Sequence, residues 1–186
     1  MGRIFVTSDL HFCHNKEFIY APRGFQNVQE MNKIIISNWN SVITPDDDIY
    51  VLGDIMLNDD AEGLRCLKSL KGNIHIIRGN HDSTSRMDLY KSCYNVVEVC
   101  EGKFLNYKGY HFYLSHYPCL SSNFDEDKPL NRRMINLCGH YHTQDPWINM
   151  DKGLIYHCEL DAHNNTPIDI DVIIIDIKDY LDTKGV

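Results

Sequence analysis

The stretch IIRGNHD, residues 76–82, passes directly from an apolar strand to three consecutive polar side chains. Its first half is typical of a buried strand, and its second half offers an amide, an imidazole and a carboxylate just after a glycine. In parallel α/β sheets, functional sites gather at the carboxyl ends of the strands. The stretch therefore predicts one wall of a site, provided that the rest of the chain supplies partners.

The sequence before this stretch predicts a parallel sheet covered by helices. Residues 3–8, 48–52 and 73–78 have the composition of strands. Helical spacing of apolar residues predicts helices over Val28–Val42 and residues 60–70. The resulting β-α-β-α-β order is typical of an α/β fold.

The sequence after this stretch changes pattern. A short helix is expected at residues 84–90, followed by strands joined by tight turns, which favours an antiparallel second half. The expected strands are residues 96–101, Lys103–Tyr107, residues 110–115, Met134–Cys138 and residues 154–160. In the tail, β-branched residues favour a strand. Ile170, Ile173, Ile174 and Ile177 nevertheless share one helical face, so we expect a C-terminal helix with Asp171 as its cap.

Length and composition indicate one globular domain over residues 1–186, with 43% hydrophobic and 24% charged residues. The net charge of −8 disfavours a nucleic-acid partner, which would require a large basic surface. Seven scattered cysteines without a CxxC pair predict reduced thiols in a cytoplasmic protein. No signal peptide or membrane span is recognisable, so no membrane partner is expected.

Polar residues suited to metal binding follow five of the expected strands. They are Asp9 and His11, Asp54, Asn80 and His81, His116, and His140 and His142. In Asp9-x-His11 and His140-x-His142, both side chains of a pair would point the same way if the backbone stayed extended. Glycines before Asp54, Asn80 and His140 would allow sharp turns close to the site.

These residue types predict a centre for two divalent cations. Imidazole nitrogen suits Mn, Fe, Zn or Ni, and carboxylate and amide oxygens favour Mn. Seven candidate ligands are too many for one ion: Asp9, His11, Asp54, Asn80, His116, His140 and His142. Two ions about 3.5–4 Å apart stabilise the attacking and leaving oxygens of an in-line phosphoryl displacement and acidify a bound water.

Taken in order, the motifs DLH, GD, GNHD, a histidine before Tyr-Pro, and GHYH resemble those of the calcineurin-like metallophosphoesterase superfamily, and most of all its small bacterial and phage members. The resemblance implies a four-layer α/β/β/α sandwich of two mixed sheets flanked by helices. It also implies that Asp54 bridges two ions, so that a metal-bridging hydroxide attacks the phosphoester, and that His81 contacts the phosphate and assists the leaving group. The implied ligands are Asp9, His11, Asp54 and His142 for one ion, and Asp54, Asn80, His116 and His140 for the other.

Other residues near the motifs have weaker signals. His14 and Arg23 are candidate substrate contacts, together with Asn80; a solvated loop position for His14 and a surface ion pair for Arg23 are the alternatives. Asp82 is expected to orient the local backbone or His81. His75 and His111 are expected to be packing residues. Residues 118–133 are the candidate substrate-facing loop, and residues 123–128 are expected to be solvated.

The leading hypothesis is a metal-dependent phosphoesterase with Asp54 and His81 as catalytic residues. A phosphodiester or a small or cyclic nucleotide is the expected substrate, because few cationic side chains lie near the motifs to bind a monoester dianion. A phosphomonoesterase and a non-catalytic metal-binding scaffold of the same fold are the alternatives. A nuclease would require a basic track, and a lipid-precursor pyrophosphatase would require an apolar cap.

Overall fold

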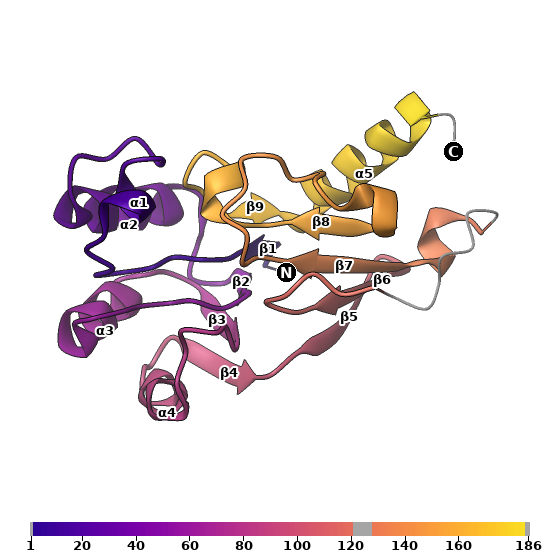
Figure 1. Cartoon of the computed structure of the whole chain (residues 1–186). Coiled ribbons are helices and arrows are strands. Elements are labelled where there is room, and N and C mark those ends of the chain that lie inside the picture. Colours follow the sequence, from indigo (N-terminus) through magenta and orange to yellow (C-terminus); the bar gives the residue numbers. More distant parts are fainter. Residues whose placement is uncertain (1, 121–127, 185–186) are drawn as a thin grey trace.

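The computed structural model describes residues 2–120 and 128–184 (Figure 1). The first half contains β1 (Ile4–Thr7), α1 (Glu17–Tyr20), α2 (Val28–Val42), β2 (Asp48–Val51), α3 (Asp60–Lys68), β3 (Asn73–Ile77) and α4 (Thr84–Lys91). The second half contains β4 (Val96–Cys100), β5 (Lys103–Tyr107), β6 (Tyr110–Leu114), β7 (Met134–Cys138), β8 (Ile155–His157), β9 (Ile168–Asp169) and α5 (Ile170–Lys184). The predicted substrate-facing loop lies partly, and the predicted solvated loop almost wholly, outside the described residues.

The first sheet has the strand order β4-β3-β2-β1-β9, in which β1 to β4 are parallel and β9 runs antiparallel to β1. The predicted parallel arrangement of the first three strands is confirmed. Thr7 pairs with Val51, and Val51 pairs with Ile76. This register brings the carboxyl ends of the three strands to one edge of the sheet.

The second sheet has the order β5-β6-β7-β8, and the prediction of an antiparallel second half is wrong for most of it. Only the hairpin partners β5 and β6 are antiparallel, whereas β6, β7 and β8 are parallel. Long connections precede β7 and β8, and connections of that length allow a strand to return in the same direction. Parallel pairing places the ends of β6 and β7 at the same edge.

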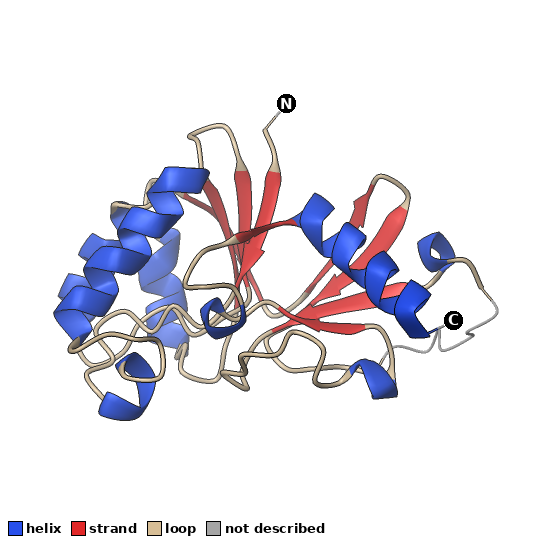
Figure 2. Cartoon of the chain, turned by 90° about the horizontal axis from the view of Figure 1, so that it is seen from above, coloured by secondary structure: helices blue, strands red, loops and turns tan. Residues whose placement is uncertain are grey.

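Figure 2 shows the two sheets with helices on their outer sides. Two hydrophobic cores join these layers. In the first core, residues such as Trp39 of α2 and Leu67 of α3 pack against one face of the first sheet. In the second core, Leu52 at the end of β2 and Leu137 of β7 are packed together with the buried isoleucines of α5. The predicted architecture of two mixed sheets flanked by helices is confirmed.

Side-chain caps fix where the helices begin. Asn27 accepts a hydrogen bond from Glu30 N at the start of α2, and Asp59 accepts one from Glu62 N at the start of α3. The predicted C-terminal helix is confirmed as α5, but Asp171 is not its cap. The Asp169 carboxylate accepts from the Asp171 amide instead, while the Asp171 carboxylate binds Lys108.

His75 and His111, which were both expected to be packing residues, lie in different environments. His75 stacks on Tyr50, and its Nδ1 lies 2.9 Å from Glu98 Oε2, so it is packed and also hydrogen-bonded. His111 is exposed and bonds to Asn106, so its predicted packing role is wrong. In the part of the chain that the structure describes, no helix combines the length and the apolar character needed to cross a membrane.

Candidate metal centre

The backbone turns sharply where the strands meet the site. Asp9, His11, Asp54, His140 and His142 all have φ between 50° and 83°, a left-handed region that residues other than glycine rarely adopt. The condition under which alternation would align the side chains of Asp9-x-His11 and His140-x-His142, an extended backbone, is therefore not met. Backbone strain of this kind clusters at functional sites, where the surrounding structure enforces it.

Hydrogen bonds between the ends of β1 and β2 hold two of these turns. Asp9 N donates to Gly53 O, and His11 N donates to Asp54 O, both over 3.0 Å. The ladder between the two strands thus continues into the turns, where it fixes the left-handed residues side by side.

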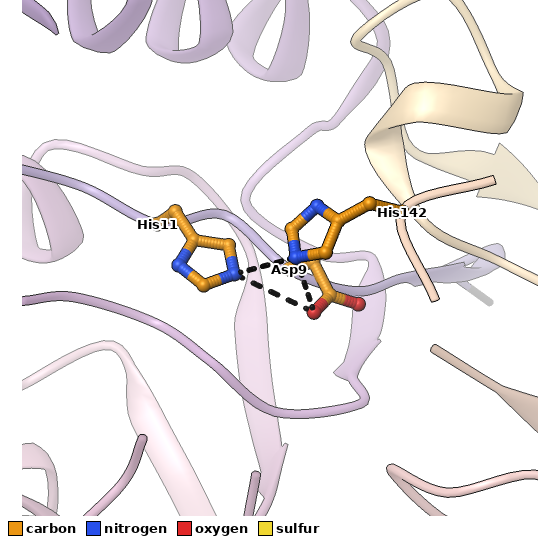
Figure 3. A group of neighbouring side chains, drawn as sticks. All are labelled: Asp9, His11 and His142. Atoms are coloured by element: carbon orange, nitrogen blue, oxygen red, sulfur yellow. Dashed lines mark hydrogen bonds and ion pairs between the residues drawn. The ribbon is translucent and has the colours of Figure 1, made fainter. Parts of the chain in front are cut away.

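Asp9, His11 and His142 form the first group of candidate ligands (Figure 3). His11 Nε2 and His142 Nε2 lie 3.0 Å apart, and each lies 3.6 Å from Asp9 Oδ1. Asp9 Oδ1 is buried without a hydrogen-bond partner among the described residues. A buried oxygen of this kind is costly unless a cation or a donor compensates it, so this atom and the two imidazoles fit a divalent ion.

Asn80, His116 and His140 form a second group from β3, β6 and β7. Asn80 Oδ1 lies 2.7 Å from His116 Nε2 and 2.9 Å from His140 Nδ1. His116 Nδ1 bonds to Leu52 O at 2.7 Å, which leaves Nε2 directed at the group. An amide oxygen and two imidazole nitrogens at these separations also suit a divalent ion.

Asp54 lies between the two groups. Its Oδ2 is 3.6 Å from His11 Nε2, 3.7 Å from His116 Nε2 and 3.9 Å from His81 Nε2. Its other oxygen, Oδ1, accepts a hydrogen bond from His81 N. One carboxylate is therefore within reach of ligands on both sides.

Gly79 and Gly139 leave room for the site carboxylates. A Cβ atom at Gly79 would collide with the side chain and amide nitrogen of Asp54, and one at Gly139 would collide with Ser8 and Asp9. Both glycines are thus required by close approach to the carboxylates, whereas the sequence predicted a role in sharp turns, and neither has a positive φ. Gly53 in addition has φ of 93°.

Asp82 orients the backbone, as predicted. Its carboxylate accepts hydrogen bonds from the amides of Asp54, Ile55 and Gly79 at 2.8–3.2 Å, and from the Tyr90 hydroxyl at 2.7 Å. One buried carboxylate therefore ties together the turns after β2 and β3, which carry Asp54 and Asn80.

Arg23 is buried, and its guanidinium is bound by residues beside the first group. Its guanidinium lies 2.7 Å from Asp161 Oδ2 and donates to the carbonyl oxygens of Asp9 and Leu10. Asp161 Oδ2 lies 3.3 Å from His142 Nδ1, so the pair contacts the face of His142 opposite the first ligand group. Arg23 does form an ion pair, but a buried one.

Asp161 and Glu159 are site residues that the sequence analysis missed. Glu159 is fully buried; its Oε1 lies 2.9 Å from His157 Nδ1 and accepts from the Tyr141 amide. It therefore holds the turn between His140 and His142. Both acids follow β8, and the rule that polar residues gather after strands would have found them if the expected strand had ended at residue 157.

Burial and mutual charges perturb several ligands. Burial lowers the pKa of His11 to about 4, although Asp9 opposes this effect. Burial favours a higher pKa for Asp9, but the interaction with the nearby His11 and the charge of His142 outweigh it and lower the pKa. Burial raises the pKa of Asp54 to about 6, with the Asp9 charge contributing. The low pKa of His11 favours the neutral imidazole that binds metals. Burial would also lower the pKa of His142, but the bond to Asp161 and the charge of Asp9 outweigh it and raise the pKa.

His81 and His14 lie beside the first group. The side chain of His81 is 40% exposed, and its ring is 5.6 Å from that of His11 and 5.9 Å from that of His14. His14 Nδ1 lies 3.1 Å from His11 Nδ1. His81 thus adjoins Asp54 from the solvent side.

Comparisons with known proteins identify relatives of this chain. The model of the calcineurin-like phosphoesterase superfamily domain matches residues 3–157. An uncharacterised protein of Methanocaldococcus jannaschii is 34% identical over 180 residues, which cover 94% of this chain and 90% of that protein. A crystal structure of a protein of unknown function from Aquifex aeolicus has a TM-score of 0.72 and 25% identity, and covers 93% of this chain and 98% of that one.

A more distant solved structure, that of an archaeal phosphodiesterase, has a TM-score of 0.50 at 14% identity and covers 84% of this chain and 82% of that one, which shows a shared fold. The match to the superfamily model covers most of the sequence, including all the motifs from Asp9 to His142. The chain therefore belongs to the calcineurin-like phosphoesterase superfamily and is a metal-dependent phosphoesterase.

Proposed function

We propose that the protein is a binuclear phosphodiesterase whose two ions share Asp54. The observation that carries this proposal is the position of Asp54 Oδ2 at 3.6 Å from His11 Nε2 and 3.7 Å from His116 Nε2, between two groups of ligands. One ion would take Asp9, His11, Asp54 and His142, and the other would take Asp54, Asn80, His116 and His140.

The donor set favours Mn, with Fe, Zn or Ni as alternatives, because both proposed sites combine imidazole nitrogen with carboxylate or amide oxygen. Two such ions would acidify a water molecule near neutral pH and stabilise the charge that develops on the phosphoryl oxygens. The chain itself supplies the ligands in fixed turns, and Asp82 keeps Asp54 and Asn80 in register.

His81 is proposed as the group that gives a proton to the leaving oxygen. Its side chain is partly exposed, where a substrate could reach it, and its backbone amide is fixed by the bond to Asp54 Oδ1. General-acid groups contribute on the order of 10²–10⁴ in rate. His14 is proposed to contact the phosphate from the neighbouring position.

Arg23 and Asp161 are proposed as positioning residues rather than substrate contacts. A metal-binding histidine commonly gives its second ring nitrogen to a carboxylate, which fixes the tautomer and the ring orientation. Asp161 is placed to do this for His142, and Arg23 holds Asp161 in turn.

The substrate is proposed to be a phosphodiester, such as a small or cyclic nucleotide. A monoester dianion would need more positive charge than a diester, and the guanidinium of Arg23 is already occupied by Asp161. The alkoxide that a nucleoside diester releases is a poor leaving group, and protonation by His81 would assist its departure. The seven free thiols support a cytoplasmic location.

A comparison of matched substrates tests the substrate class. Methyl p-nitrophenyl phosphate and p-nitrophenyl phosphate share one leaving group but differ in charge. The Mn-loaded protein should cleave the diester with the higher kcat/KM at pH 7.5. A clear preference for the monoester would contradict the proposed class while leaving the metal centre in place.

A further inference from the structure

Three exposed aromatic side chains lie beside the histidines of the metal centre. Phe18 is 70% exposed, Tyr117 is 50% exposed and Tyr141 is 54% exposed. They come from α1 and from the turns after β6 and β7. Exposed aromatic side chains beside a phosphate-binding site offer faces on which planar ligand groups stack.

Phe18 lies on the side of His14 and His81. Its ring meets the His14 ring edge-on at 5.9 Å, and the His14 ring meets that of His81 at the same separation. Ile19 is the buried residue that anchors α1, so Phe18 is not needed to hold this helix in place. Phe18 leaves most of its ring to solvent and has no polar atom that would favour this exposure.

Tyr117 lies on the side of the second ligand group. Its ring centre is 4.7 Å from that of His140 and 5.1 Å from that of His116, with the rings steeply inclined in both pairs. Tyr141 instead stacks on the buried His157 at an interplanar angle of 20°. Aromatic surface is thus exposed beside both proposed metal sites.

We infer that Phe18 and Tyr117 determine specificity by stacking on the planar rings of a nucleoside phosphodiester, one on each side of the phosphorus. The inference rests on the proposed phosphodiesterase function, which it narrows to substrates that carry at least one nucleobase. Stacking on an aromatic side chain tolerates any base, because every base has a π-face. We therefore expect little discrimination between purines and pyrimidines.

Binding of two phosphates to the Mn-loaded protein tests the inference. Adenosine 5′-monophosphate and ribose 5-phosphate carry the same phosphate and sugar, and only the first carries a base. Calorimetric titration should give a Kd about tenfold lower for the base-bearing probe, in line with the stacking energies of aromatic residues at such sites. Equal Kd values for the two probes would overturn the inference.

Variants of Phe18 and Tyr117 test whether these two residues cause the preference for the base-bearing probe. Phe18→Leu and Tyr117→Leu should each reduce the ratio of the two Kd values, and the double variant should bring it close to one. Phe104→Leu is the matched control, since Phe104 is 71% exposed on β5, an edge strand, and contacts Tyr113 rather than the site. It should keep the wild-type ratio. A base preference that persists in the double variant would overturn the inference.

Hydrolysis of methyl p-nitrophenyl phosphate by the wild type separates this inference from the proposed function. Hydrolysis without any base preference in binding would leave the phosphodiesterase proposal standing and remove the stacking role. A base preference without hydrolysis of either the diester or the monoester would support nucleotide binding by Phe18 and Tyr117 and contradict the proposed catalysis.

Discussion

Asp161 and Arg23 form an ion pair of 2.7 Å in which both side chains are at least 94% buried. Burial would raise the pKa of Asp161, but the bonds from His142 and Arg23 outweigh it and lower the pKa. The carboxylate of Asp161 is therefore kept ionised next to Nδ1 of His142, a proposed metal ligand. Removing one partner of a buried pair is more damaging than removing an exposed charge.

Asp161→Asn should weaken the first metal site without removing any ligand. The amide keeps the shape of the carboxylate but loses the charge that orients His142 and neutralises Arg23. Changes in groups that support a ligand typically cost 10–100-fold in metal affinity. We expect Mn titration to show one weakened binding step, whereas Asp151→Asn, at an exposed position, should leave both steps unchanged. Unaltered affinity in Asp161→Asn would contradict the positioning role.

Asp54→Asn should stabilise the metal-free protein above pH 6. The pKa of Asp54 rises from 3.8 to about 6 in the folded state, so the folded state binds this proton more tightly than the unfolded state does. The stability that protonation confers is present below pH 3.8 and is lost as the pH rises to about 6. A neutral amide avoids that loss, which is on the order of 3 kcal/mol at pH 8.

Urea unfolding with a chelator at pH 8 and pH 4 measures this effect. The gain in unfolding free energy should appear at pH 8 and vanish at pH 4, and the same variant should lose Mn binding at both sites. Asp88→Asn, on the exposed side of α4, is the control for the loss of one carboxylate. A variant that is less stable than the wild type at pH 8 without metal would contradict the account of Asp54.

Gly79→Ala and Gly139→Ala should each disturb both folding and metal binding. The added methyl group would meet Asp54 in the first variant, and Ser8 and Asp9 in the second. Overpacking of this kind costs about 1–3 kcal/mol, and relief requires the carboxylate to move. Gly102→Ala is a suitable comparison, because the nearest atom is the mobile hydroxyl end of Tyr113. Thermal unfolding and Mn titration of the three variants measure both effects. An unchanged melting temperature and Mn affinity in Gly79→Ala or Gly139→Ala would contradict the close approach to the carboxylates.

His81→Ala should keep both metal sites and lose most turnover. The variant removes a partly exposed imidazole whose ring nitrogen is 3.9 Å from Asp54, while the backbone amide that binds Asp54 remains. We expect kcat for a diester to fall on the order of 10²–10⁴-fold. His111→Ala, an exposed histidine on β6, should behave as the wild type. Loss of metal from His81→Ala comparable to that from Asp54→Asn would reassign His81 as a ligand.

Local patterns predicted most elements of this fold. The bounds of α2, β5 and β7 match the expected ranges, because each has a clear apolar period and turn residues at its ends. Strand pairing depends on where a distant segment returns, so the parallel β6, β7 and β8 were not recognisable from local alternation. The four-residue α1 is too short to produce a helical period.

In the site, too, local sequence predicted some features, and others depend on contacts between distant segments. Residues that follow strands could be found by position, which is how Asp9 and Asn80 were selected. The left-handed backbone at Asp9 could not, because tertiary hydrogen bonds impose it. The buried pair of Arg23 and Asp161 joins residues 138 positions apart, and only the folded chain brings them together.

The measurement that tests the central claim most directly is the hydrolysis of methyl p-nitrophenyl phosphate as metal-stripped protein is titrated with Mn. If two ions share Asp54, activity should rise with added Mn and saturate near two equivalents per chain. Saturation at one equivalent would contradict the binuclear centre. Binding of two equivalents without hydrolysis, repeated with Fe, Zn and Ni, would contradict catalysis and favour a metal-binding scaffold.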